Sequence, residues 1–252
     1  MAEFDGKVAI VTGGLSGIGA AAAELLSSRG ATVVAAGLPG PASAGVELDV
    51  TDAAGCFQLV DEVVRTHGRL DIVVAAAGIQ RYGDVVETTA EEWQTVLDVN
   101  VTGAFNIVKP ALPHLRARGA GAIVLVSSVQ AFVTQESVAA YTTSKGALNA
   151  LTRSIAVDEA AHGIRANTVC PGSVDTPMLR ASARTFSDGS PVGEQQLIDT
   201  WGRMHPLGRV ARPAEVAEAI AFLAGDRSSF ITGIALPVDG GLLAKAAVLL
   251  PD

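Results

Sequence analysis

Short runs of β-branched and aliphatic residues alternate along this chain with longer stretches whose apolar residues recur every three or four positions. Runs bounded by turn residues predict strands, and the longer period predicts helices. The predicted strands are 7–12, 32–36, 46–48, 72–75, 122–127, 165–170 and 234–237. The predicted helices are 17–29, 52–67, 91–99, 102–116, 139–161 and 213–224. Apolar strands separated by helices indicate an α/β fold, a doubly wound parallel sheet with helices on both faces.

No linker, repeat or low-complexity segment divides the 252 residues, so we expect a single domain over residues 1–252. Residues 175–205 break the alternation, because they hold two prolines and three glycines and show a helical pattern only near 194–204. A long irregular segment in a compact domain usually carries function. We therefore interpret residues 175–205 as a substrate lid.

Composition narrows the class of protein. Hydrophobic residues make up 49% and charged residues 17%, which is typical of a globular chain, and the net charge of −8 argues against binding to nucleic acid or anionic membranes. The N-terminus lacks the basic and apolar regions of a signal peptide, and no stretch approaches the roughly 20 apolar residues of a membrane span. We expect a cytoplasmic protein. Two cysteines and four scattered histidines have no metal-ligand spacing, so no metal site is expected. The apolar tail at 242–250 is expected to pack against another subunit.

Tyr141 and Lys145 carry the most informative chemistry. They lie four residues apart in a predicted helix, which places a phenol and an ammonium on the same face. A nearby cation favours the phenolate, so we expect the Tyr141 pKa to fall from about 10 toward neutrality. A tyrosine tuned in this way can act as a general acid or base. Ser128, thirteen positions upstream of Tyr141, can supply a second hydrogen bond to the same substrate oxygen.

A glycine-rich turn joins the first predicted strand to the first helix. Residues 12–19 read Thr-Gly-Gly-Leu-Ser-Gly-Ile-Gly, and the useful spacing is Gly13-x-x-x-Gly17-x-Gly19. Glycines let the backbone turn sharply and approach a pyrophosphate, while the helix N-terminus offers free N–H groups. The turn therefore predicts a dinucleotide site.

Further motifs follow in a fixed order. They are Asn100 within Asp-Val-Asn-Val, Ser128, the Tyr141 and Lys145 pair, Pro171-Gly172, and Pro-Val-Asp-Gly-Gly at 237–241. Together with the glycine turn, they make essentially the whole chain resemble the classical short-chain dehydrogenases/reductases. The resemblance implies a Rossmann fold that binds NAD or NADP across the carboxyl ends of its strands, and a homotetramer.

The resemblance also implies an activity, the NAD(P)-dependent interconversion of a secondary alcohol and a ketone by hydride transfer. Tyr141 would be the general acid/base, and Ser128 would orient and polarise the substrate oxygen. Lys145 would lower the tyrosine pKa and bind the nicotinamide ribose. Asn100 would hold a water that links Lys145 to solvent.

Cofactor contacts are implied along the glycine turn, at the ends of the next three strands and after Pro171-Gly172. Asp49 and Val50 would touch the adenine, and Val174 and Thr176 the carboxamide and phosphates. The implied contacts are Gly13, Leu15, Ser16, Gly17, Ile18, Gly19, Gly37, Leu38, Asp49, Val50, Ala76, Ala77, Gly78, Tyr141, Lys145, Pro171, Gly172, Val174 and Thr176.

Two departures from the family pattern stand out. Residues 75–78 read Ala-Ala-Ala-Gly where the family often has Asn-Asn-Ala-Gly. Gly37 stands where NAD-dependent members place an Asp for the ribose, while Leu38 and Ser16 stand where NADP-dependent members place a basic residue. No Lys or Arg occurs between Arg29 and Arg65 to meet a 2′-phosphate. We favour NAD, and NADP stays open.

Residues after Ser128 and in the lid are candidates to line the substrate pocket, although apolar residues among them could equally belong to the core. They are Gln130, Phe132, Val133, Met178, Leu179, Trp201 and His205. Two other readings of the same fold remain open. One is a cofactor-sensing binding protein, and the other is an isomerase or dehydratase without net redox change.

Overall fold

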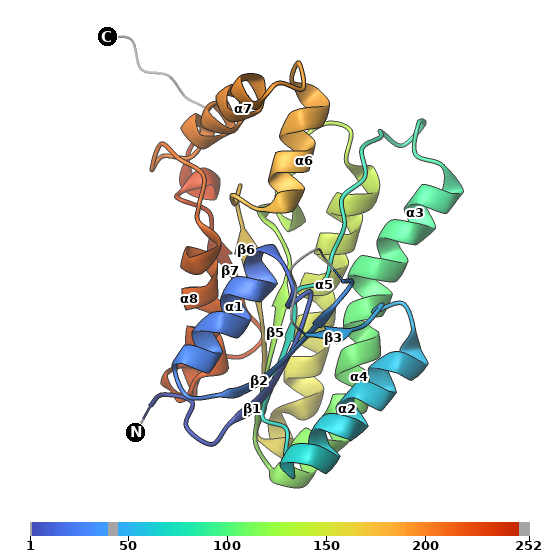
Figure 1. Ribbon diagram of the computed structural model, residues 1–252, viewed down its shortest axis with the longest axis vertical. Coiled ribbons are helices and arrows are strands. Elements are labelled where there is room, and N and C mark those ends of the chain that lie inside the picture. The colour runs from blue at the N-terminus through green and yellow to red at the C-terminus, as the bar shows by residue number, and fades with distance from the viewer. Residues whose placement is uncertain (1, 40–44, 247–252) are drawn as a thin grey trace.

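Seven parallel strands form one sheet in the order β3-β2-β1-β4-β5-β6-β7 (Figure 1). The computed structural model describes residues 2–39 and 45–246. The strands are β1 (Val8–Thr12), β2 (Thr32–Gly37), β3 (Val46–Glu47), β4 (Ile72–Ala75), β5 (Gly121–Val126), β6 (Ile164–Pro171) and β7 (Ala235–Val238). The chain order reverses between β1 and β4, and ligands of such sheets bind outside the carboxyl ends of the strands at this switch point.

Helices cover both faces of the sheet, as expected for a doubly wound fold. They are α1 (Gly17–Ser28), α2 (Ala53–His67), α3 (Ala90–Leu97), α4 (Gly103–Arg118), α5 (Ala139–Glu159), α6 (Pro177–Phe186), α7 (Pro191–Met204) and α8 (Pro213–Ala224). One face packs against α1 and α8, and the other against α2, α4 and α5 (Figure 1). The predicted α/β architecture is confirmed.

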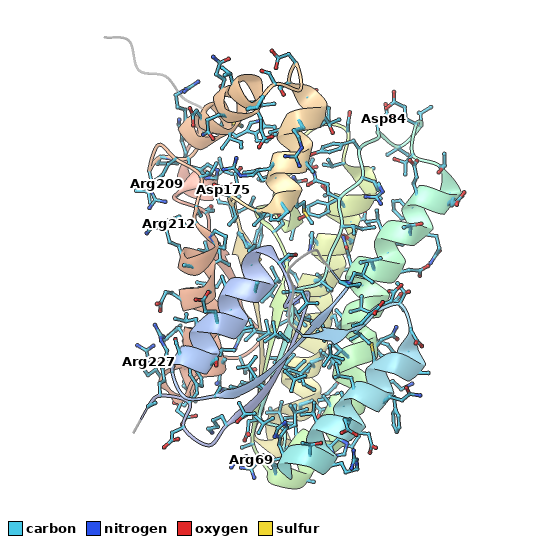
Figure 2. The ribbon with its side chains drawn as sticks, viewed as in Figure 1. Arg69, Asp84, Asp175, Arg209, Arg212 and Arg227 are labelled. Carbon is cyan, nitrogen blue, oxygen red and sulfur yellow. The ribbon has the colours of Figure 1, made fainter. Side chains whose placement is uncertain are left out.

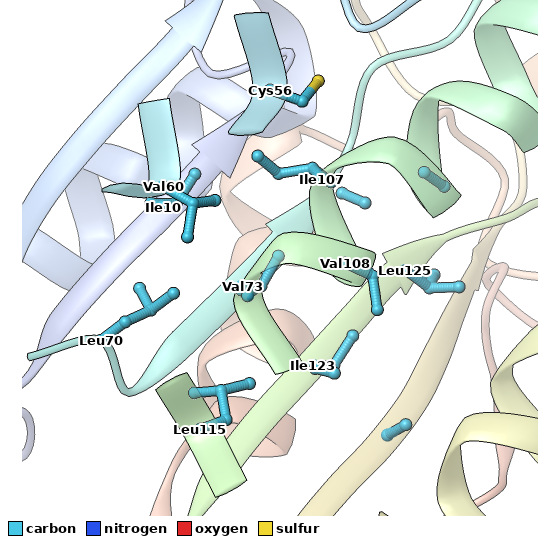
Figure 3. Close-up of a cluster of buried hydrophobic side chains, with 14 of the residues drawn as sticks. Ile10, Cys56, Val60, Leu70, Val73, Ile107, Val108, Leu115, Ile123 and Leu125 are labelled. Atoms are coloured by element: carbon cyan, nitrogen blue, oxygen red, sulfur yellow. The ribbon is translucent and has the colours of Figure 1, made fainter. Parts of the chain in front are cut away.

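Alternate residues of the central strands enter two separate cores. Ile10, Val73 and Ile123 pack with α2, α4 and α5. Figure 3 shows them together with the labelled residues of α2 and α4. Their neighbours Val11 and Val74 face α1 and α8 instead. All five side chains are buried, because a parallel sheet covered on both faces leaves neither side to solvent.

The lid segment differs from the irregular backbone that the sequence predicted. It forms two helices, α6 and α7, which lie above the carboxyl ends of the strands (Figure 1). The Thr176 hydroxyl caps α6, accepting from the Leu179 N–H at 3.3 Å, and the Ser190 hydroxyl caps α7. Each cap is followed by a proline in the first turn of the helix, where a missing N–H costs nothing. The prolines therefore start helices here. The prediction of irregular backbone was wrong for α6, whereas the helical pattern predicted near 194–204 corresponds to α7.

A second difference concerns the stretch between the two helices predicted at 91–99 and 102–116. A π-helical turn over Asp98–Thr102 joins α3 to α4 without a break. Such a turn accommodates one extra residue within a helix and is frequent at functional sites. Asn100 lies in its centre.

The C-terminal tail is described only in part. Leu242–Ala244 forms a short 3₁₀ turn, whereas 247–250 of the predicted apolar tail lie outside the described residues. Within residues 2–39 and 45–246, none of the helices combines the length and apolar character that crossing a bilayer requires.

Candidate active site

A cavity of about 960 Å³ opens at the carboxyl ends of the central strands. Its lining comes from the glycine turn, from the strand ends of β4, β5 and β6, from the start of α5 and from α6 and α7. The predicted dinucleotide turn therefore faces the same space as Ser128, Tyr141 and Lys145.

The glycine turn brings backbone close to backbone. Gly13 has φ +65°, and a Cβ there would lie 2.6 Å from the Ala77 backbone nitrogen. A Cβ on Gly19 would overlap the Gly13 carbonyl, so this glycine lets α1 pack on the turn. Only glycine fits at both positions.

The N-terminus of α1 supplies the electrostatic part of the same cradle. Ser16 precedes the helix without a side-chain cap, and the first turn carries no acidic residue. The first N–H groups of α1 are thus available for an anion, and Ser16, Gly17 and Ile18 line the cavity. This arrangement fits the pyrophosphate of a dinucleotide.

Tyr141 is the third residue of α5, and the start of this helix forms part of the cavity lining. Its side chain is 9% exposed, and the Ser128 hydroxyl lies near enough to its own hydroxyl to lower its pKa. Ser128 follows β5 and caps a short 3₁₀ turn, accepting from the Gln130 N–H at 3.2 Å. The Ser128 and Tyr141 hydroxyls can therefore approach one substrate oxygen together.

Lys145 lies one helical turn after Tyr141. Its Nζ is 5.3 Å from the centre of the Tyr141 ring and donates a hydrogen bond of 3.0 Å to the Val126 carbonyl. A Cβ added to Gly78 would come within 3.4 Å of the same Nζ, so the glycine leaves the ammonium accessible from the cavity. Lys145 and Gly78 both line the cavity.

The expected fall of the Tyr141 pKa is not what the structure gives. Burial raises the pKa of Tyr141 to about 12, against the opposing influence of the nearby Ser128 hydroxyl. Burial also lowers the pKa of Lys145 to about 8, because the low-polarity interior disfavours the ammonium. The prediction weighed the spacing of the two residues and left out their burial, which dominates both shifts in the protein alone.

Asn100 lies behind this pair and is 1% exposed. Its carboxamide accepts from the Ile79 N–H at 2.8 Å and donates to the Ile79 carbonyl at 3.0 Å and to the Ser144 hydroxyl at 2.9 Å. A Cβ on Gly78 would lie 3.3 Å from its Oδ1 and 3.4 Å from the Lys145 Nζ, so the two side chains border the same glycine. Asn100 ties the segment after β4 to α5.

Most residues that the sequence assigned to cofactor or substrate line the cavity. They are Gly13, Ser16, Gly17, Ile18, Gly19, Ala76, Ala77, Gly78, Ser128, Gln130, Val133, Tyr141, Lys145, Pro171, Gly172, Val174, Thr176, Met178, Leu179, Trp201 and His205. The assigned residues outside this lining are Leu15, Gly37, Leu38, Asp49, Val50, Asn100 and Phe132.

The residues outside the lining lie at several places. Asp49 and Val50 follow β3, and Asn100 lies in the π-helical turn. Gly37 and Leu38 end β2, and a Cβ on Gly37 would contact Leu15 at 3.5 Å, so these three form one surface beside the glycine turn. Phe132, by contrast, is 51% exposed. Its apolar character suggested the pocket wall, but the 3₁₀ turn after Ser128 directs it elsewhere.

His205 lines the cavity, but both of its ring nitrogens face backbone partners. Nδ1 lies 2.6 Å from the Asp239 carbonyl, and the Ser173 N–H donates to Nε2 at 3.4 Å. The Asp239 contact places the proton on Nδ1. This pairing joins the end of α7 to the ends of β6 and β7.

An ion-pair network holds α6 to α7. Arg180 contacts Asp175 at 2.8 Å and Glu194 at 3.1 Å, and Arg184 contacts Glu194 at 3.0 Å. Glu194 is 8% exposed, and Figure 2 shows Asp175 near the base of α6. α6 and α7 are thus coupled through one buried carboxylate.

Sequence reasoning missed several residues of the cavity lining. They are Gln80, Tyr82, Ser182, Phe186, Leu197 and Met204. The Thr-Pro and Ser-Pro pairs that start α6 and α7 were the available signal for four of them, because helices there would bring one face over the strand ends. A lone tyrosine in a loop carries no such signal.

Comparison with known proteins identifies the class. A family model described as enoyl-(acyl carrier protein) reductase matches residues 13–243. The cis-4-hydroxycyclohexanecarboxylate dehydrogenase of Sinomonas cyclohexanicum is 41% identical, with 96% of this chain and 98% of that protein covered. The meso-2,3-butanediol dehydrogenase of Serratia marcescens is 38% identical, with coverage of 96% and 97%. The ligand-free aldohexose dehydrogenase of Thermoplasma acidophilum superposes with a TM-score of 0.96 at 38% identity, covering 100% of this chain and 99% of that one.

The fold is a Rossmann-type sheet, and the relatives named above are dehydrogenases. The chain belongs to the short-chain dehydrogenase/reductase family and is an oxidoreductase.

Proposed function

We propose that this protein interconverts a secondary alcohol and a ketone with a nicotinamide dinucleotide. The observation that carries the proposal is the single cavity that joins the glycine turn to Ser128, Tyr141 and Lys145. The turn fits a pyrophosphate, and the two hydroxyls meet at one point of the wall. The related enzymes named for hydroxycyclohexanecarboxylate and butanediol both act on secondary alcohols, which supports this substrate class.

In this proposal the cofactor supplies hydride transfer and the chain supplies the proton chemistry. Tyr141 takes the hydroxyl proton during oxidation and returns it during reduction, while Ser128 holds the substrate oxygen beside it. Lys145 binds the nicotinamide ribose, and Asn100 holds the water that connects Lys145 to solvent. The burial that raises the Tyr141 pKa also excludes water, which strengthens the hydrogen bonds to a developing alkoxide.

NAD is the favoured cofactor, with NADP as the alternative. Leu38 is 67% exposed beside Gly37 at the end of β2, and the chain offers no basic residue between Arg29 and Arg65 for a 2′-phosphate. The remaining contacts of the adenosine half are assigned to Leu15, Asp49 and Val50. We also assign residues 1–252 to one domain. Within it, α6 and α7 have the role of a lid over the substrate site.

A cytoplasmic homotetramer is the proposed assembly. The two long helices α4 and α5 expose Phe105, which is 46% exposed, and Val157, which is 78% exposed. Such residues on neighbouring helices support burial against another copy. Light scattering should give the mass of four 25.6 kDa chains, and a monomeric mass would contradict the assembly.

The activity is tested by following NADH or NADPH absorbance over a panel of secondary alcohols and ketones. Tyr141→Phe serves as the blank, because it removes the proton donor and keeps the ring. We expect turnover with NAD that drops at least ~10³-fold in the variant, while the Kd for NADH stays within about threefold. Silence in every well with the cofactor bound would favour a sensing protein, and substrate conversion without net NADH change would favour an isomerase or dehydratase.

A further inference from the structure

Tyr82 is an aromatic residue of the cavity to which no role has been assigned above. It follows β4 in the loop that leads to α3, the loop whose Asp84 is labelled in Figure 2. Its ring meets the Phe186 ring edge-on, with centres 4.5 Å apart and planes at 84°. Tyr82 and Phe186 both line the cavity, and we call this pair the aromatic wall.

The Tyr82 side chain lies against α6. The Ser182 hydroxyl on α6 lies beside the Tyr82 hydroxyl and opposes the rise that burial causes in the Tyr82 pKa. The Ser182 hydroxyl itself donates to the Met178 carbonyl at 3.1 Å. Tyr82 therefore has Phe186 and Ser182, two positions of α6, as neighbours.

The backbone next to Tyr82 is fixed to the catalytic helix. The Gly83 N–H donates to the Ser137 carbonyl at 2.8 Å, and the Ala139 N–H donates to the Gly83 carbonyl at 3.3 Å. Ser137 has φ +57°, which makes it the one non-glycine residue with positive φ in the described part of the chain. A strained residue persists when its surroundings determine it, so this junction between the loop and α5 is well defined.

The wall also lies close to the reacting phenol. A charge on Tyr82 would disfavour a charge on Tyr141, and Tyr82 accordingly contributes to the raised pKa of Tyr141. Tyr82 is thus held between the start of α5 and the lid helix, with the proton-donating phenol nearby. A side chain restrained from two sides yields little when a ligand presses on it.

We propose that Tyr82 is a specificity-determining residue whose ring, backed by Phe186, limits the size of the substituent that a ketone or alcohol can carry. This inference rests on the proposed function for the identity of the ligand. Compact or single-ring substrates fit beside the aromatic wall, whereas fused-ring substituents collide with it. The hydroxyl of Tyr82 has a smaller part in this selection, because the ring forms the packed contact with Phe186.

The test compares binding of two ketones, cyclohexanone and 1-acetonaphthone, by calorimetry in the presence of NADH. Wild type should prefer cyclohexanone. Tyr82→Ala should shift the ratio of the two Kd values at least tenfold toward 1-acetonaphthone, and Phe186→Ala should shift it in the same direction. Tyr82→Phe should keep the ratio within about twofold. Phe57→Ala, at an exposed position of α2, is the matched control and should change nothing.

The outcomes separate the two proposals. A melting curve confirms that each variant folds, and Phe186→Ala opens the same wall if Tyr82→Ala does not fold. An unchanged binding ratio in a folded alanine variant overturns the wall. Absence of NADH formation or consumption with the corresponding alcohols and ketones, while the binding ratio still shifts, overturns the proposed activity and leaves the wall standing.

Discussion

The Lys145 ammonium lies 5.3 Å above the centre of the Tyr141 ring and donates at 3.0 Å to the Val126 carbonyl. Both side chains are buried, at 4% and 9% exposure. Burial disfavours the charged form of each group, which lowers the lysine pKa to about 8 and raises the tyrosine pKa to about 12. Burial of the pair therefore reduces the stability of the folded protein, while it fixes the positions of the ammonium and the phenol.

Replacing Lys145 with Met should raise the melting temperature at pH 7 and abolish turnover. The lysine pKa falls from 10.5 to about 8 on folding, so the folded state binds fewer protons between these values. Stability of the wild type should then rise with pH from about 8 to about 10.5, and below pH 8 the burial costs on the order of 3 kcal/mol. The Met variant also loses the hydrogen bond to the Val126 carbonyl, which offsets part of its gain in stability.

Calorimetry of both proteins at pH 7 and pH 10 checks this expectation. The advantage of the Met variant should be a few degrees at pH 7 and should shrink at pH 10. A difference in melting temperature that does not depend on pH would show that Lys145 is not held against its own charge.

Gly37→Asp should sharpen the choice of cofactor. A Cβ at this position would meet nothing closer than Leu15 at 3.5 Å, which is ordinary contact, so a carboxylate can be placed there without strain. It would accept hydrogen bonds from ribose hydroxyls and repel a 2′-phosphate. We expect the Kd for NADPH to rise more than tenfold while the Kd for NADH falls severalfold.

Leu38→Arg is the reciprocal variant. Leu38 follows Gly37 and is exposed, so an arginine at this position can reach a phosphate. It should tighten NADPH binding and leave NADH nearly unchanged. Fluorescence titration of both cofactors measures all four constants. Equal effects on the two cofactors in both variants would place the ribose elsewhere.

Asn100→Ala should reduce kcat more than the alanine substitution of a comparable buried asparagine does. Asn167 offers the control, since its carboxamide also bridges backbone groups, donating to the Ile231 carbonyl at 2.9 Å and accepting from the Ile234 N–H at 3.2 Å. Loss of either amide leaves buried partners unsatisfied and should cost about 1–3 kcal/mol of stability. Only Asn100→Ala is expected to lower kcat, by at least tenfold, because it alone borders Lys145. Equal kcat losses in the two variants would assign Asn100 a purely structural role.

Glu194→Gln should loosen the lid. Its carboxylate on α7 binds Arg180 and Arg184 of α6, and the amide of glutamine has the same shape without the charge. We expect the KM for substrate to rise at least threefold with little change in NADH binding, and the effect should lessen at high salt.

Glu215→Gln provides the comparison on the surface. Glu215 pairs with Arg209 and Arg212, both labelled in Figure 2, at the start of α8. The neighbouring guanidinium of Arg209 holds the pKa of Glu215 at about 2, yet the pair lies outside the cavity lining. Steady-state kinetics should show an unchanged KM in this variant. A raised KM in both would point to general destabilisation.

The centre of the sheet was predictable because β1, β4 and β5 are nearly continuous apolar runs. Ile10, Val73 and Ile123 sit in runs that are hydrophobic on both faces, which is the pattern of a parallel sheet buried on both sides. The glycine turn was predictable for a similar reason, since Gly13 and Gly19 are required by close backbone approaches that no side chain tolerates.

Other features depend on tertiary structure and left weaker traces. Pro177 and Pro191 looked like helix breakers, although each follows a capping hydroxyl and starts a helix. The pKa of Tyr141 is set by burial, and spacing along one helix says nothing about what covers it. Tyr82 joins the cavity only because Gly83 pairs with the start of α5, a contact between segments far apart in the chain.

The π-helical turn at Asp98–Thr102 holds one residue more than a regular α-helical path would. Removing one residue there would let α3 and α4 merge into a regular α-helix, the more favourable backbone geometry. The same deletion would rotate the Asn100 side chain by about 100° and detach it from Ile79. A library screened for thermal resistance alone should therefore accumulate shortened, inert proteins at this point.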